Sequence, residues 1–247
     1  MDYLRDIMTQ IELHSVQGIR DCFENGVSAN MMYKGKPLIE ELISEYARTD
    51  RFKECVKLFV DYGLYFEDKA LLAVLLDDSV TLEKLIAGNP GIVTHHYTLQ
   101  CAYTPLDQVT LLHICAEFNH VACATVLLRH KADINAKAGT DDHGFGGQTP
   151  IFHTVNQNNN HSKPMLDLLL LQKADLGITV QGIVWGKGYE WETLIPSVNP
   201  ISYAMMGLLP QMHRSEKAIS ETVLRLIQHR YQVAYSLKNV PNKYLSS

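Results

Sequence analysis

The fold of this chain is indicated by residues 109–136, which read VTLLHICAEFNHVACATVLLRHKADINA. Thr110 offers a hydroxyl group that can cap the first free amides of a helix. The apolar residues that follow are spaced as on one side of a helix, and Asn119-His120 separates them from a second apolar helix. Two short helices of this kind cannot bury their apolar faces alone. The segment therefore predicts a repeat that stacks against copies of itself.

These residues resemble the ankyrin repeat, whose pattern is T-P-L-H-x-A, then G-H, L-L and G-A-D-x-N. Here the pattern reads TLLHICA at 110–116, NH at 119–120, LL at 127–128 and KADIN at 131–135. Leu111 stands where the family has proline, and Asn119 and Lys131 stand where it has glycine. A second copy starts with TPIF at 149–152. The resemblance implies an all-α fold, an ankyrin-type helical solenoid with β-hairpin fingers.

A repeat of about 33 residues extends this interpretation along the chain. We expect one solenoid over residues 1–247, with units that start near residues 3, 36, 69, 110, 149 and 199. Gly26 and Gly63 fit the left-handed residue that closes a helix, although any helical bundle can end its helices in this way. Three segments lengthen the period and are interpreted as insertions, namely residues 91–108, 136–148 and 177–197. We expect the first to be a loop. The second lies where the family has a hairpin finger. The third is predicted to be an extended β-hairpin.

Composition and charge narrow the classes of partner. The net charge is −5 at neutral pH, and residues 210–247 carry six basic against two acidic residues, so the rest of the chain is acidic. An acidic body gives no electrostatic reason to bind nucleic acid. The longest apolar run, residues 70–76, is far shorter than the ~20 residues that span a bilayer. The five cysteines show no C-x-x-C spacing, and the N-terminus does not resemble a signal peptide. We therefore expect a cytoplasmic monomer with buried free thiols and no membrane partner.

No catalytic motif is present in the sequence: it lacks G-x-S-x-G, H-E-x-x-H, G-x-G-x-x-G and a phosphate-binding loop. The resemblance assigns His113 to hydrogen bonds within and between repeats. We therefore expect neither an enzyme nor a cofactor. The alternative is a metal-dependent or small-molecule enzyme that uses Asp141, Asp142, His143 and Glu190 in the finger loops. A short polar turn explains the first three of these residues equally well.

Protein binding is the favoured function. The resemblance places variable contact positions at the ends of the first helices and in the finger before residue 149, and the third insertion adds aromatic residues, which often anchor interfaces. The candidate contact residues are Glu117, Phe118, Phe145, Gln148, Asn156, Gln157, Trp185, Tyr189, Glu190, Trp191 and Met206. Alternatively, the two tryptophans pack the hairpin against its neighbours. The sequence thus predicts a non-enzymatic scaffold that binds another protein through a concave face and the 177–197 finger.

Overall fold

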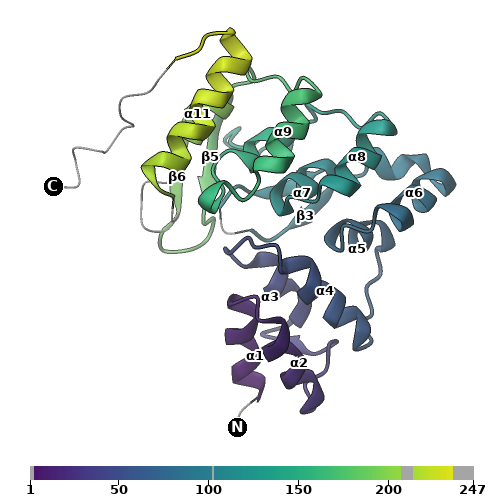
Figure 1. Cartoon of the computed structure of the whole chain (residues 1–247). Helices are drawn as coiled ribbons and strands as arrows, with labels where there is room; N and C mark the ends of the chain where they lie inside the picture. Colours follow the sequence, from purple (N-terminus) through teal and green to yellow (C-terminus); the bar gives the residue numbers. More distant parts are fainter. Residues whose placement is uncertain (1–2, 102, 207–213, 236–247) are drawn as a thin grey trace.

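Paired helices make up most of the computed structural model, which describes residues 3–101, 103–206 and 214–235 (Figure 1). The helices are α1 (Tyr3–Glu12), α2 (Val16–Glu24), α3 (Leu38–Ser44), α4 (Phe52–Asp61), α5 (Lys69–Leu75), α6 (Ser79–Gly88), α7 (Leu111–Phe118), α8 (Val121–Arg129), α9 (Lys163–Leu171), α10 (Pro200–Ala204) and α11 (Glu216–Tyr231), with 3-10 turns η1 (Pro90–Thr94), η2 (Pro150–Thr154) and η3 (Asn158–Asn160).

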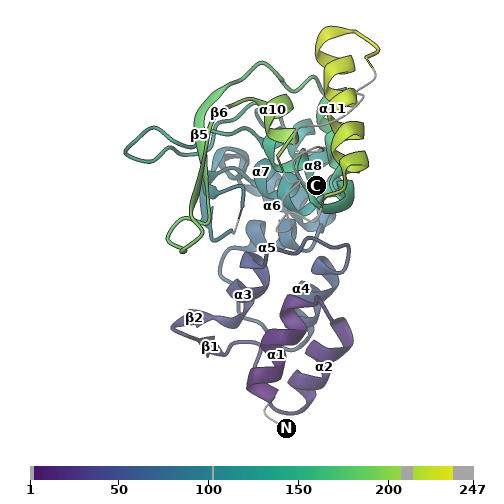
Figure 2. The same cartoon turned by 90° about the vertical axis from the view of Figure 1, so that its left-hand side faces the viewer.

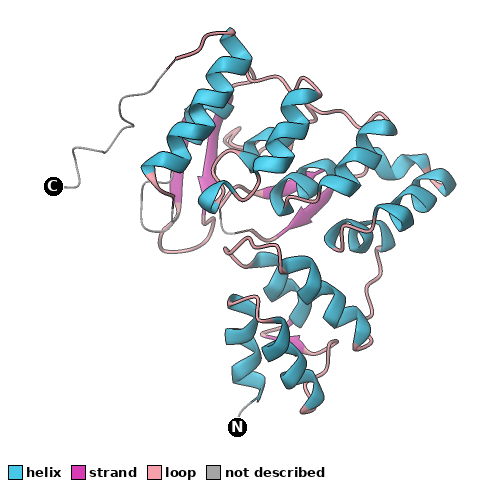
Figure 3. Cartoon of the chain, viewed as in Figure 1, coloured by secondary structure: helices cyan, strands magenta, loops and turns pink. Residues whose placement is uncertain are grey.

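Three antiparallel strand pairs lie between these helices: β1 (Met32–Tyr33) with β2 (Lys36–Pro37), β3 (Tyr97–Leu99) with β4 (Leu106–Val109), and β5 (Val180–Trp185) with β6 (Thr193–Val198) (Figure 3). The pairs β1–β2 and β5–β6 project from the same side of the molecule (Figure 2). The last pair lies in the region where the sequence predicted an extended β-hairpin, and its second strand ends at Val198.

Two of the other connecting segments differ from expectation. Residues 91–108 were expected to be a loop, but they contain most of η1 together with β3 and most of β4, because Tyr97 and Leu106 turn inward into the core. Residues 136–148 form a loop closed by one bridge, between Thr140 and Gly146, in place of a hairpin finger. Within this segment Asp141 caps a tight turn through the amides of His143 and Phe145.

Local chemistry explains where the helices begin and end. Asp68 accepts a hydrogen bond from the Leu71 amide at 2.8 Å at the start of α5, and Asn199 does the same for the Ile201 amide at 3.0 Å at the start of α10. Gly63, with φ +83°, follows the end of α4 in the left-handed region, as its place in the sequence predicted.

The helices are arranged in two blocks, α1–α4 and α5–α11. Within the first block α1 packs on α3 and α2 on α4. Within the second, α5 packs on α7 and α6 on α8. The corresponding pairs α3 with α5 and α4 with α6 approach each other closely at few positions, in the part of the chain that the structure describes. In Figure 1 the interruption lies where the chain passes from α4 to α5. We call this break the junction.

The two blocks are held together at the other end of the junction by buried side chains. Phe52, at the start of α4, stacks on Phe118, at the end of α7, with ring centroids 4.2 Å apart. Arg48, in the turn between α3 and α4, reaches the same place and lies 4.6 Å from the centre of the Phe118 ring. The N-terminal block therefore contacts α7 directly, across the position of the intervening unit.

All five cysteines are free thiols, as predicted, and all except the half-buried Cys101 are buried. Burial raises the pKa of Cys22 to about 11, assisted by Asp6, and raises the pKa of Cys55 to about 12. Burial, together with Glu117, likewise raises the pKa of Cys101 to about 12. Among the described residues, no helix combines the length and the apolar character that crossing a bilayer requires.

Candidate protein-binding surface

The β5–β6 hairpin is fixed to the body of the molecule by Trp185. This side chain is buried, and its indole Nε1 donates a hydrogen bond of 2.6 Å to the Tyr203 hydroxyl. The Tyr203 hydroxyl also lies 2.8 Å from that of Thr104. Trp185 therefore has the packing role that the sequence left open as an alternative, and it does not lie on the surface.

The tip of the hairpin presents the two other aromatic side chains to solvent. Tyr189 and Trp191 stack with ring centroids 5.4 Å apart and an interplanar angle of 19°, and 47% and 44% of their surfaces are exposed. The buried Gly186, with φ +59°, lies beneath Trp191; a Cβ atom there would fall 2.4 Å from the indole ring. The glycine thus allows the ring to lie flat against the backbone.

A chain of hydrogen bonds connects the hairpins. The Gln100 side chain, just after β3, donates from Nε2 to the Tyr189 hydroxyl at 2.9 Å. Its Oε1 accepts a hydrogen bond of 2.5 Å from Lys36 Nζ on β2. Lys36, Gln100, Tyr189 and Trp191 therefore belong to one continuous surface, which we call the hairpin face.

A groove of about 450 Å³ opens beside the hairpin face at the junction. Helix α3 and the end of β3 with Gln100 form two of its walls, and the segment between α4 and α5 completes it together with Leu71 on α5. Its lining is mainly apolar, with Ile39, Ile43, Leu71 and Leu99, and Tyr65 stands at the wall with 76% of its surface exposed. We call this hollow the junction groove. No single stretch of sequence marks it, because it exists only where the helix stacking is interrupted.

Glu117 and Phe118, expected on the concave surface, are instead buried beneath the turn that follows α3. Glu117 accepts from Arg48 Nε at 2.8 Å and from His153 Nδ1 at 2.9 Å, and the Arg48, Glu117 and His153 side chains are 3%, 5% and 0% exposed. Burial opposes ionisation of Glu117, but Arg48 and His153 outweigh it and hold the pKa of Glu117 at about 2. The sequence analysis placed Glu117 on the surface because its partner Arg48 lies 69 residues upstream, where no local pattern could reveal the contact.

The other residues expected to contact a partner are either buried, half-buried or exposed. Gln148, Asn156 and Gln157 are buried; Gln148 Nε2 donates to the Pro105 carbonyl at 2.6 Å, and Gln157 Nε2 donates to the His153 carbonyl at 3.1 Å. Phe145 and Met206 are half-buried. Of the residues chosen from the sequence, Tyr189, Glu190 and Trp191 are exposed. The sequence analysis did not select Lys36, Gln100 or Tyr65. Of these, Tyr65 could have been selected, because it is an aromatic residue in a connection between two predicted helices.

His113 takes the role that the resemblance implied. Its Nδ1 accepts from the Thr110 amide at 3.2 Å, so Nε2 carries the proton and donates to the Gln148 carbonyl at 3.1 Å. The first bond lies within the motif and the second reaches the segment before η2. Burial, reinforced by the neighbouring His153, lowers the pKa of His113 to about 3, which keeps the ring neutral.

The loop residues of the enzymatic alternative have local roles or face solvent. Asp141 Oδ1 accepts hydrogen bonds from the amides of His143 and Phe145, at 2.9 and 3.0 Å, as in a polar turn. Asp142, His143 and Glu190 are exposed. Within residues 3–101, 103–206 and 214–235, no group of three or more His, Cys, Asp or Glu side chains is arranged to hold a metal ion.

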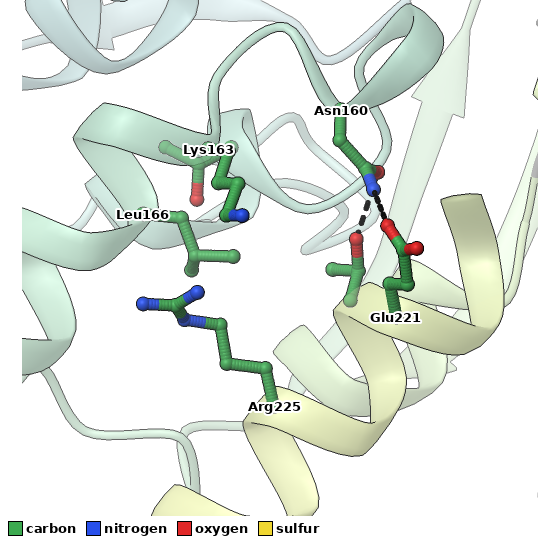
Figure 4. Close-up of a pocket in the computed structure, with 7 residues that line it drawn as sticks. Asn160, Lys163, Leu166, Glu221 and Arg225 are labelled. Atoms are coloured by element: carbon green, nitrogen blue, oxygen red, sulfur yellow. Dashed lines mark hydrogen bonds between the residues drawn. The ribbon is translucent and has the colours of Figure 1, made fainter. Parts of the chain in front are cut away.

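A smaller hollow of about 180 Å³ lies between α9 and α11 (Figure 4). Lys163 and Arg225 extend toward each other across it, while Asn160 donates to Glu221 at 3.5 Å on the other side. Arg225 also pairs with Asp167 on α9. The Arg225–Asp167 pair and the Asn160–Glu221 hydrogen bond connect α11 to the body of the molecule.

Comparison with known proteins identifies one part of the chain. A family model for the ankyrin repeat matches residues 107–138, which contain most of β4 and all of α7 and α8. No curated protein matches the chain. An ankyrin repeat is therefore present at the segment from which the sequence analysis started, and ankyrin repeats generally mediate protein–protein interactions.

Proposed function

We propose that this chain is a non-enzymatic scaffold that binds another protein through the hairpin face, acting as a monomer in the cytoplasm. We further propose that it is a stack of about six ankyrin-type units, which start near residues 3, 36, 69, 110, 149 and 199. The matched repeat at 107–138 and the recurrence of helix pairs near these positions support this interpretation. The broken stacking at the junction makes it an irregular stack.

The observation that carries the proposal is the exposed, stacked pair of Tyr189 and Trp191. Large aromatic side chains contribute most when they are buried at the centre of an interface. Rings that are already fixed lose little conformational entropy on binding, so more of the contact energy remains as affinity. Gly186 below Trp191 and Gln100 beside Tyr189 supply this fixation.

The contact surface that we propose is smaller than the one expected from the sequence. Glu117, Phe118, Gln148, Asn156 and Gln157 are used inside the protein, so a partner would reach the hairpin tips before it reached them. The exposed Glu190 and the half-buried Phe145 and Met206 remain candidates at the edges of the surface.

The experiment is affinity capture from the native cell, quantified by mass spectrometry, with the unaltered chain, a Tyr189→Ala/Trp191→Ala variant and a matched control. The control is Tyr231→Ala/Tyr235→Ala, which removes two aromatic residues that are 60% and 59% exposed at and beyond the end of α11. We expect the face variant to lose its specific partner by about tenfold or more, as is typical of aromatic anchors. Equal recovery by all three proteins, with unchanged circular dichroism, would contradict the proposal.

A further inference from the structure

We propose that the junction groove binds a short peptide segment of the partner protein in which aliphatic side chains alternate with lysine or arginine. This inference rests on the proposed binding function and names the chemistry of the segment that is bound. It is carried by the shape, the apolar lining and the charge of the groove, all of which arise at the break between the two helical blocks.

The break explains why an apolar hollow remains open. In a regular stack, the first helices of adjacent units pack side by side and cover each other's apolar residues. Here α3 and α5 approach each other closely at few positions, and the hollow is lined by the buried Ile39, Ile43 and Leu71 and by the more accessible Tyr65, Phe66 and Leu99. A volume of about 450 Å³ lies within the range of pockets that hold small ligands and peptide side chains.

The charge of the groove selects the polar part of the segment. Its lining includes the carboxylates of Glu40, Glu67 and Asp68 and contains no lysine or arginine. Asp68 is occupied as the cap of α5, where it accepts from the Leu71 amide. Glu40 and Glu67 are exposed and have no hydrogen bond or ion pair with any described residue. Two unpaired carboxylates at the rim of an apolar hollow are complementary to cations that flank apolar anchors.

Among the described residues, the neighbouring lysines Lys36 and Lys69 form no ion pair with these carboxylates, although Lys69 Nζ lies 5.8 Å from the centre of the Tyr65 ring. Lys36 donates to Gln100, and Lys69 Nζ donates to the Phe66 carbonyl at 2.6 Å. The groove therefore keeps its negative charge, and an acidic segment would meet repulsion. A segment that leaves the groove past Gln100 reaches Tyr189 directly, so both sites can serve one partner.

The test is a selection of phage-displayed random dodecapeptides on the intact chain, followed by fluorescence polarisation with the enriched peptides. We expect enrichment of sequences with lysine or arginine beside aliphatic residues. Glu40→Gln/Glu67→Gln should weaken an enriched peptide roughly fivefold to tenfold, as loss of two exposed ion pairs implies. Tyr65→Ala should weaken it by about fivefold or more through lost contact. Both changes are at exposed positions, so folding is preserved.

The matched control is Glu54→Gln/Asp142→Asn, which removes two exposed acidic groups outside the groove and should leave the affinity unchanged. Enriched peptides that lack cations, or peptides unaffected by the groove variants, would overturn the inference. So would the absence of any enrichment, or a dimer in sedimentation experiments that the groove variants dissociate, since the occupant would then be a second copy. If only the Tyr189→Ala/Trp191→Ala variant lost peptide binding, the groove would not be the binding site, while the proposed function would still stand.

Discussion

At the scale of single residues, the buried pair of Arg48 and Glu117 joins the two helical blocks. Removing one member of a buried ion pair leaves the other charge without its partner in a medium that solvates it poorly. Replacing both members costs less, because no uncompensated charge then remains. His153 also contacts Glu117, so the carboxylate keeps one hydrogen bond when Arg48 is lost.

We therefore predict that Arg48→Met lowers the free energy of unfolding by about 3 kcal/mol, the lower end of the range for a broken buried pair. Urea denaturation followed by circular dichroism measures the change. In the Arg48→Met/Glu117→Gln variant a substantial part of the loss should be recovered, because the unpaired charge is gone. A single-variant cost of less than about 1 kcal/mol would show that the pair is not a structural connection.

Buried histidines should make stability depend on pH. Burial lowers the pKa of His14 and of His120 to about 4 and that of His113 to about 3, all below the value of about 6.5 expected in the unfolded chain. The unfolded state therefore binds protons first as pH falls. The stabilisation from the neutral rings is fully present above pH 6.5 and is lost as pH falls toward 4.

The measurement is the free energy of unfolding in urea at several pH values between 7.5 and 4. We expect a steady fall over this window and a shallower fall for His120→Gln, which removes one titrating ring while keeping a side-chain donor for the Val74 carbonyl that His120 contacts at 2.6 Å. The exposed His95→Gln is the control and should leave the slope unchanged. A flat profile from pH 7 to 4 would contradict this account.

At the scale of elements, the hairpin tip depends on a glycine that only the folded structure distinguishes from its neighbour. Gly186 and Gly188 both have positive φ, so alanine strains the backbone at either place by about 1 kcal/mol. At Gly186 the added methyl group would also overlap the Trp191 ring, whereas at Gly188 no atom lies within 4 Å.

Gly186→Ala is therefore predicted to displace Trp191 from its stack with Tyr189, while Gly188→Ala keeps the stack. Near-ultraviolet circular dichroism and tryptophan fluorescence detect the change, and partner capture should fall only for Gly186→Ala. If the two variants give the same spectra, Trp191 does not depend on the backbone beneath it.

The elements also show what the sequence could and could not predict. The start of α7, at Thr110 with His113, and the start of α10, at Asn199 with Pro200, are set by residues at most three positions apart. Their positions therefore follow from the local sequence pattern. The β5–β6 hairpin likewise follows from β-prone residues around a glycine turn. The sequence analysis did not predict the strands in residues 91–108, because such short strands are determined by tertiary burial, here of Tyr97 and Leu106.

At the scale of the whole molecule, the interrupted stacking could not be anticipated from a regular period. The period predicts where units begin, but the burial of Glu117 and Phe118 depends on side chains of the first block that lie more than sixty residues away in sequence. Glu117 and Phe118, which were expected on a concave surface, therefore form buried contacts between the two blocks. For the same reason, the junction groove is a property of the assembled molecule.

Because Arg48 and Phe52 connect the two blocks through buried contacts, loss of these contacts should let the blocks separate before either unfolds. We predict that Phe118→Ala accelerates amide hydrogen exchange throughout α1–α4 more than in α8 and α9, since it removes the ring on which Phe52 stacks. Hydrogen exchange with mass spectrometry measures this. Leu226→Ala, at another fully buried position, in α11, is the control and should spare the first block. Uniform acceleration by Phe118→Ala would indicate a single cooperative unit.

The distribution of the free thiols has a practical consequence. Cys22 and Cys55 lie in the first block, Cys115 and Cys123 in the second, and Cys101 contacts Arg48 beside the junction. A thiol with a raised pKa, shielded from water, alkylates slowly until its surroundings open. The native cysteines can therefore report the opening of each block. The rates at which iodoacetamide alkylates them would show in which order the blocks open, without any introduced probe.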